Sequence, residues 1–183
     1  QALNTLATER LKHAPGWMAV YTNDGFSLLE PLIEAVSGQT FIDFVEKEIF
    51  QPLGMEHSRY PIEEFPEDSY AHVYAGDEAF PYLYLNIYGT GALYSTPSDM
   101  AKFAMMFASG GEFEGKRILS ESALRQMGQN QTAGNFNPLP SDYIRFGLGW
   151  DTVAQPGMSA LDVQGWQKGG DVTGFYGATM IVL

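Results

Sequence analysis

Apolar residues recur at helical spacing in separate stretches of the chain, and these stretches are bounded by residues that favour helix ends. Thr40 precedes one such stretch and is followed three residues later by Asp43, as in a helix N-cap. Thr96 precedes Pro97 and Asp99, which places a cap, a first-turn proline and a first-turn acid in order. The pattern predicts one helix after Thr40 and another after Thr96.

Two further helices are predicted from the same signals. The segment 26–37 carries apolar residues on one face and is followed by Gly38, a residue typical of a helix C-terminus. Pro31 is tolerated only in the first turns, so this helix is expected to start late. Ser120 begins a short helix that should end near Met127.

Strand character collects near the C-terminus. Residues 146–153 and 173–183 read as strands, whereas residues 57–88, with three prolines and many tyrosines, are expected to be irregular. Because helices and strands are segregated rather than alternating, the pattern indicates an α+β protein. We assign a mostly helical part to residues 1–140 and the sheet part to residues 141–183, together one incomplete domain.

Composition narrows the possible functions. With 22 acidic and 10 basic residues the formal charge is −12, which disfavours a nucleic-acid partner. The chain has no cysteine, and its three histidines, His13, His57 and His72, are scattered, so no metal site is expected. No apolar run approaches the ~20 residues that span a bilayer, so no membrane segment is expected.

Both ends of the sequence read like the interior of a longer protein. Leu3, Leu6 and Leu11 have near-helical spacing directly at the start, where there is no Met. Residues 178–183 form an apolar run that stops without a turn. We therefore expect a fragment of a longer chain, although a complete chain ending in a buried strand is an alternative.

The candidate catalytic residues give only weak evidence of function when each is considered alone. Tyr21 is one of ten tyrosines and by default a core residue, Asn23 suits a turn or cap, and Lys168 suits the surface. The run Gly89-Thr90-Gly91 lacks the rest of a dinucleotide fingerprint and reads as a turn. There is no Gly-x-Ser-x-Gly, which argues against an α/β-hydrolase.

Taken together, Tyr21-Thr22-Asn23 and Lys168-Gly169-Gly170 resemble two of the three catalytic motifs of the serine beta-lactamase and penicillin-binding-protein superfamily. The surrounding segments also resemble that superfamily in order and spacing: 15–29, 37–55, 89–100, 146–150 and 168–175. The resemblance is strongest to the branch of class C beta-lactamases, D-alanyl-D-alanine peptidases, aminopeptidases and esterases. It implies an antiparallel sheet flanked by helices with an inserted helical subdomain, of which this chain would supply part.

The resemblance also implies roles for individual residues. Tyr21 would act as the base or as a proton shuttle, and Asn23 would hydrogen-bond the substrate amide or a catalytic lysine. Lys168 would supply positive charge, and the backbone N–H of Asp171 would be one donor to the oxyanion. Gly170 and the glycine before it would let the substrate approach the strand closely.

The third motif, Ser-x-x-Lys, carries the nucleophile in this superfamily, and no serine of the chain has a lysine three residues later. The resemblance implies that the intact protein is a serine hydrolase acting through an acyl-enzyme on an ester, amide or lactam, with no metal or cofactor. The remainder of the protein would supply the nucleophile, and this chain alone would be inactive. The alternative is a non-catalytic relative that binds a ligand or acts in assembly. A Ser-x-x-Lys upstream of Gln1 would favour the enzyme.

Two departures from the family pattern bear on the substrate. Gly169 stands where lactamases and peptidases usually carry Thr or Ser to bind the substrate carboxylate, and Asp171 adds negative charge near the oxyanion. Both weaken the case for a beta-lactam or a D-alanine-terminated peptide and favour short neutral esters or amides. An extracytoplasmic or periplasmic location is implied by the family alone.

Overall fold

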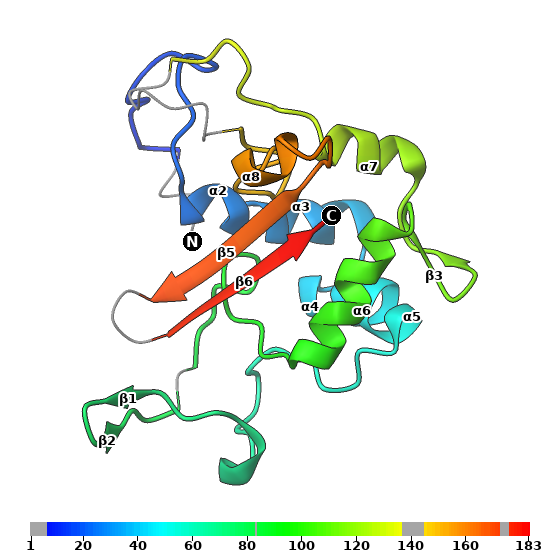
Figure 1. The fold of residues 1–183 in the computed structure, drawn as a ribbon. Helices are drawn as coiled ribbons and strands as arrows, with labels where there is room; N and C mark the ends of the chain where they lie inside the picture. The colour runs from blue at the N-terminus through cyan, green and yellow to red at the C-terminus, as the bar shows by residue number, and fades with distance from the viewer. Residues whose placement is uncertain (1–6, 83, 137–144, 173–175) are drawn as a thin grey trace.

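The computed structural model describes residues 7–82, 84–136, 145–172 and 176–183, which form helices and short antiparallel sheets (Figure 1). The helical elements are α2 (Asn23–Ser27), α3 (Leu29–Ser37), α4 (Phe41–Val45), the π-helical turn η1 (Glu46–Phe50), α5 (Gln51–Leu53), the 3-10 turn η2 (Glu67–Ser69), α6 (Pro97–Ala108), α7 (Glu121–Met127) and α8 (Pro156–Ser159). The strands are β1 (Tyr74–Ala75), β2 (Glu78–Ala79), β3 (Glu112–Phe113), β4 (Lys116–Arg117), β5 (Trp166–Val172) and β6 (Tyr176–Val182). The predicted α+β class is confirmed.

The helix starts follow the local capping chemistry. The Thr40 hydroxyl oxygen accepts a hydrogen bond from the Asp43 N–H at 3.1 Å, and Thr96 accepts one from the Asp99 N–H at 3.2 Å. Each bond satisfies a backbone donor that has no partner inside the helix. Gly38 ends α3 with φ of 70°, a left-handed conformation that costs glycine little. These predicted boundaries are confirmed.

The helix predicted over residues 26–37 is present in two pieces. α3 begins at Leu29, which puts Pro31 in its first turn, where a missing N–H breaks no intrahelical bond. The predicted late start is therefore confirmed for α3. The preceding turn is also helical, however, since α2 begins at Asn23 and is separated from α3 by Leu28 alone.

β5 and β6 form the longest antiparallel pair in the described part of the chain, and Lys168 on β5 lies opposite Met180 on β6. The strand predicted over residues 146–153 is wrong. There the Gly147 N–H donates to the Trp150 carbonyl at 3.1 Å, and Gly149 has φ of 81°, so the segment turns back on itself. Of the strand predicted over residues 173–183, the part at 173–175 lies outside the described residues.

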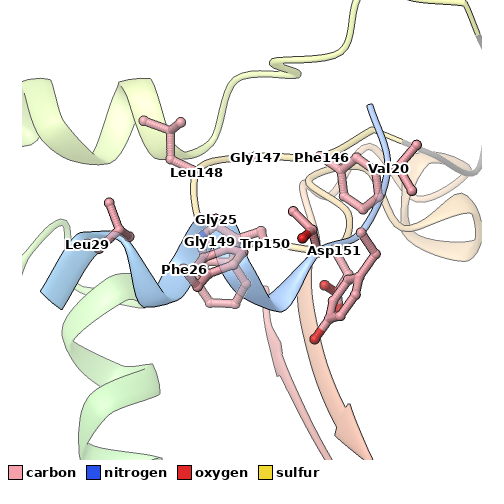
Figure 2. Close-up of a pocket in the computed structure, with 12 residues that line it drawn as sticks. Val20, Gly25, Phe26, Leu29, Phe146, Gly147, Leu148, Gly149, Trp150 and Asp151 are labelled. Atoms are coloured by element: carbon pink, nitrogen blue, oxygen red, sulfur yellow. The ribbon is translucent and has the colours of Figure 1, made fainter. Parts of the chain in front are cut away.

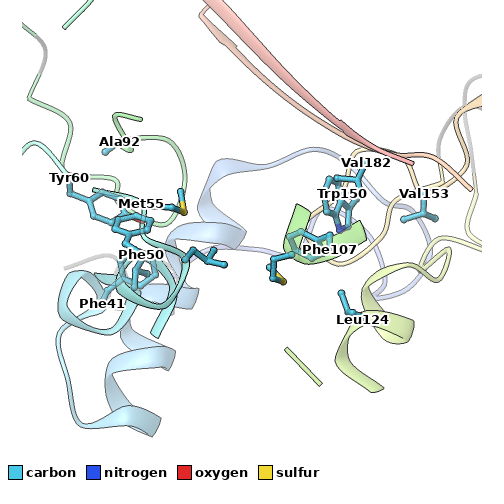
Figure 3. Close-up of a cluster of buried hydrophobic side chains, with 13 residues drawn as sticks. Phe41, Phe50, Met55, Tyr60, Ala92, Phe107, Leu124, Trp150, Val153 and Val182 are labelled. Carbon is cyan, nitrogen blue, oxygen red and sulfur yellow. The ribbon is translucent and has the colours of Figure 1, made fainter. Parts of the chain in front are cut away.

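The buried core joins this loop and strand to the helices (Figure 3). Phe107 of α6 packs its ring against Trp150 at 5.1 Å between centroids and against Trp166 of β5 at 6.1 Å. The two tryptophan rings also lie 5.4 Å apart. Such aromatic packing buries large apolar areas in a defined geometry, so it fixes the position of β5 relative to α6.

Two predictions of organisation are not decided by the structure. The N-terminal helix suggested by the leucine spacing falls partly on residues 1–6, outside the described residues, while residues 7–13 are not helical. The boundary placed between residues 140 and 141 also lies outside them and stays a prediction. Residues 57–88 are largely irregular where described, as expected, apart from η2 and the β1–β2 hairpin.

Candidate active site

A cavity of about 480 Å³ lies between the start of the α2–α3 helical segment and the loop at residues 146–151 (Figure 2). Its walls are mostly apolar, and Asp151 lies near Val20 and Phe146 at one end, whereas Leu29 and Leu148 lie at the other. The residues that line it are Val20, Tyr21, Thr22, Gly25, Phe26, Leu29, Phe146, Gly147, Leu148, Gly149, Trp150 and Asp151. A concave, largely apolar site with few polar groups is typical of small-molecule binding.

The structure brings together two of the residues singled out in the sequence. The Lys168 Nζ lies 5.5 Å from the centroid of the Tyr21 ring, although the two residues are far apart in the chain. This separation is within the range of a cation–π contact. Tyr21 lines the cavity and is 59% exposed, so its side chain is accessible to a ligand.

Asp151 holds the lysine and its strand in place, and the sequence analysis missed it. Its Oδ1 lies 3.3 Å from Lys168 Nζ, and its Oδ2 accepts a hydrogen bond from the Gly169 N–H at 2.7 Å. Lys168 also donates to the Gly169 carbonyl. No local pattern indicated this contact, because Asp151 and Lys168 are 17 positions apart in the chain. They meet because the loop that carries Asp151 lies along β5, where the Asp151 N–H donates to the Gln167 carbonyl at 2.9 Å.

Asn23 is placed by a turn packed against α2. Its carbonyl accepts a hydrogen bond from Thr90 Oγ1 at 3.1 Å, and Thr90 Oγ1 lies 2.8 Å from Ser27 Oγ. The Gly89 N–H donates to Glu30 of α3 at 2.7 Å, which confirms residues 89–91 as a turn. Within the described ranges the polar and ring contacts of Lys168 are with Asp151, Gly169 and Tyr21, so Asn23 is not among its partners.

The glycine and the acid that follow Lys168 lie farther along β5. Gly170 pairs with Ala178, and a side chain added to it would meet nothing within 4 Å. Asp171 is exposed and pairs with Gly177. The space above Gly170 is therefore open to a ligand, as the expected close approach to the strand requires.

No metal-binding cluster and no membrane-spanning helix is present among the described residues. They contain no group of three or more His, Cys, Asp or Glu side chains placed to hold a metal ion. None of the helices formed by these residues is both long enough and apolar enough to cross a membrane.

The arrangement of helices and sheet is that of beta-lactamases and penicillin-binding proteins. A class C beta-lactamase aligns with 96% of this chain and 52% of its own at a TM-score of 0.69 and 20% identity. The octameric penicillin-binding protein homologue from Pyrococcus abyssi aligns with 93% of this chain and 38% of its own, with a TM-score of 0.65 and 22% identity. The sequence model of the Beta-lactamase family matches residues 1–183, and the chain belongs to that family.

Curated relatives are considerably longer than this chain. The D-alanyl-D-alanine-carboxypeptidase/endopeptidase AmpH of Escherichia coli (strain K12) is 34% identical over 105 residues, which cover 57% of this chain and 27% of AmpH. The chain spans between 23% and 40% of the length of the first curated relatives it matches. The predicted fold class and family are thereby confirmed, while the roles of single residues stay predictions.

Proposed function

We propose that this chain is the substrate-binding and proton-transfer part of a serine hydrolase that works through an acyl-enzyme. The single observation that carries the proposal is the position of Lys168 Nζ, 5.5 Å from the ring of Tyr21 at the edge of an open apolar cavity. Membership of the Beta-lactamase family supports it. The nucleophilic serine is supplied by polypeptide beyond this chain.

In the proposed reaction, the serine oxygen bonds to the substrate carbonyl carbon while its proton passes to the Tyr21 oxygen. Tyr21 accepts this proton in its phenolate form, whose negative charge Lys168 stabilises beforehand, and the Asp171 N–H donates to the oxyanion. The bond to the leaving oxygen or nitrogen then breaks, and that atom takes the proton back from Tyr21. Water then attacks the acyl carbonyl carbon and gives a proton to Tyr21. The serine oxygen takes this proton as its bond to the acyl group breaks.

The proposed substrates are short neutral esters or amides. Gly169 offers no hydroxyl to a substrate carboxylate, and a hydrogen bond to a charged group is worth ~1.5–3 kcal/mol, so its loss lowers carboxylate recognition by one to two orders of magnitude. A longer protein containing this chain should therefore hydrolyse a short-chain nitrophenyl ester faster than the beta-lactam nitrocefin. Gly169→Thr should shift the ratio of kcat/KM toward nitrocefin, and an unmodified enzyme that strongly prefers nitrocefin would refute this substrate assignment.

The mechanism is tested by Tyr21→Phe in the same longer protein. Loss of a general base costs ~10²–10⁴-fold in rate, so kcat should fall by that factor while KM changes little. Tyr74→Phe is the matched control, since Tyr74 is an exposed tyrosine on β1, outside the residues that line the cavity. Equal activity of the two variants would rule out the proposed role of Tyr21.

A second function, ligand binding without catalysis, is favoured by one observation, the absence of a Ser-x-x-Lys from the sequence. It predicts that the longer protein binds small esters or amides in the cavity without turnover. Steady binding with no ester hydrolysis, in a protein whose fold is verified by circular dichroism, would support this function over the enzyme.

A further inference from the structure

We infer that Asp151 determines the charge of the ligand that this site accepts, because its carboxylate pairs with Lys168 and lies in the wall of the cavity. The inference rests on the proposed function insofar as the cavity is the substrate site. It assigns to Asp151 a role in specificity, and to the site a preference for uncharged ligands with an apolar group.

The ammonium of Lys168 is already engaged by the protein. A lysine has three N–H donors. Asp151 Oδ1 lies 3.3 Å from Nζ, and the Gly169 carbonyl accepts a second contact. The two charged side chains are 32% and 35% exposed, so they lie in partial contact with water but are shielded on their inner side. A ligand carboxylate would have to compete with Asp151 for the lysine.

The position of Asp151 on the cavity wall adds a second obstacle. Asp151 lines the cavity, and Lys168 is not among the lining residues. Figure 2 shows the Asp151 side chain at the end of the cavity occupied by Val20 and Phe146. An anionic ligand would therefore meet the carboxylate before the ammonium, and like charges in a partly enclosed site repel each other more strongly than in water.

The strand is held by the same carboxylate. Asp151 Oδ2 accepts the Gly169 N–H at 2.7 Å, which commits the second oxygen and fixes the side chain toward β5. A Cβ at Gly169 would lie 3.6 Å from that oxygen, so a hydroxyl added at position 169 would arrive beside a carboxylate. Lys168 is thus held in an internal ion pair beside position 169.

The test uses the 183-residue chain and two matched probes, phenylacetate and phenylacetamide, which differ in charge but share an aromatic group. Binding is followed by nuclear magnetic resonance of the ¹⁵N-labelled chain, with the Gly169 amide as the reporter. The unmodified chain should bind phenylacetamide more tightly. Asp151→Asn removes the charge and keeps an oxygen that can accept the Gly169 N–H, so it should shift preference toward phenylacetate by about tenfold, equivalent to ~1.4 kcal/mol.

Asp77→Asn is the matched control, because Asp77 is exposed in the turn of the β1–β2 hairpin and its replacement changes net charge equally. It should change the preference less than about twofold, equivalent to ~0.4 kcal/mol. Adding Lys168→Gln to Asp151→Asn should abolish the gain. Asp151→Ser, which carries a smaller acceptor, should also shift the binding preference toward phenylacetate. It replaces Asp151→Asn in the test if the asparagine variant does not fold.

Three results would overturn the inference. They are a preference of the unmodified chain for phenylacetate, an equal shift in Asp151→Asn and Asp77→Asn, and no response of the Gly169 amide to either probe. None of these measurements depends on turnover. The proposed hydrolase could therefore fail in its own kinetic test while the ligand preference holds, and the two failures are distinguishable.

Discussion

Asp99 is a buried charge that joins the segment after α5 to α6, and we expect its removal to lower the free energy of unfolding. Its side chain is 1% exposed. Its Oδ2 accepts the His57 N–H at 2.8 Å and the Ser58 hydroxyl at 2.9 Å, and its Oδ1 lies 3.2 Å from Lys102 Nζ. Asp99→Ala would remove the acceptor of the part-buried His57 N–H, of the buried Ser58 hydroxyl and of the Lys102 ammonium.

The magnitude follows from these contacts. A hydrogen bond to a charged group contributes ~1.5–3 kcal/mol, and removal of one partner from a buried ion pair costs ~3–5 kcal/mol. Lys102 is about one-third exposed, so solvent screens its share and the two short hydrogen bonds dominate. We expect Asp99→Ala to lower the free energy of unfolding by ~3–5 kcal/mol and Asp99→Asn, which keeps an acceptor, by ~1–3 kcal/mol.

Asp43 provides a matched control. Like Asp99 it lies at the third position of a helix capped by threonine, but it is exposed, and its carboxylate accepts the Thr40 hydroxyl at 2.6 Å. Asp43→Ala should cost only ~0.5–1 kcal/mol. Urea unfolding followed by circular dichroism measures all three variants at constant m-value. If Asp99→Ala and Asp43→Ala cost the same, the argument from burial is refuted.

The same network predicts a dependence of stability on pH. Burial alone would raise the pKa of Asp99. The hydrogen bonds from His57 and Ser58, together with Lys102, outweigh burial and hold its pKa below the usual range. Because the folded pKa lies below the unfolded value of ~3.9, this stabilisation is complete above pH ~4 and is lost as the pH falls through the folded pKa. In Asp99→Asn, the part of the stability loss at acid pH that comes from protonation of Asp99 should disappear.

Two further predictions concern stability. Burial, followed by the neighbouring Tyr94 and Tyr84, raises the pKa of Tyr82 to about 12, and its buried hydroxyl has no hydrogen-bond partner among the described residues. The stability contributed by neutral Tyr82 is therefore present below pH ~10 and lost as the pH rises toward the folded pKa. Tyr82→Phe should reduce the loss of stability at alkaline pH without lowering stability at neutral pH. Thermal melts at a series of pH values would show this. Gly147→Ala would drive a methyl group into the Met127 carbonyl and the Val153 side chain and should cost ~1–3 kcal/mol or more, whereas Gly157→Ala, with open space around its Cβ, should be nearly neutral in urea unfolding. Equal losses in the two glycine variants would contradict the steric explanation.

The features that the sequence predicted correctly are governed by neighbouring residues. A threonine three positions before an aspartate specifies a helix start because donor and acceptor lie within one turn, as at Thr40 and Thr96. Pro31 likewise limits where α3 can begin, through its own backbone geometry. The family resemblance supplied what these local rules could not, namely that Tyr21 and Lys168 belong to one site.

The features that the sequence did not predict depend on distant parts of the chain. Residues 146–153 have apolar residues suited to a strand, but the turn between Gly147 and Trp150 lets Trp150 enter the core beside Phe107. Asp151 then lies next to β5 and pairs with Lys168 only because that loop and strand are aligned. An acid with no helical or strand partner nearby in sequence carries no local signal of such a contact.

The most direct test of the central claim is intact-mass measurement after treatment with a serine-directed fluorophosphonate, followed by peptide mapping. We expect the 183-residue chain to gain no adduct, because it has no Ser-x-x-Lys. A longer protein containing it should gain one adduct, on a serine outside residues 1–183 and three positions before a lysine. A stoichiometric adduct on any residue of this chain, or none on the folded longer protein, would contradict the claim that this chain completes a serine hydrolase.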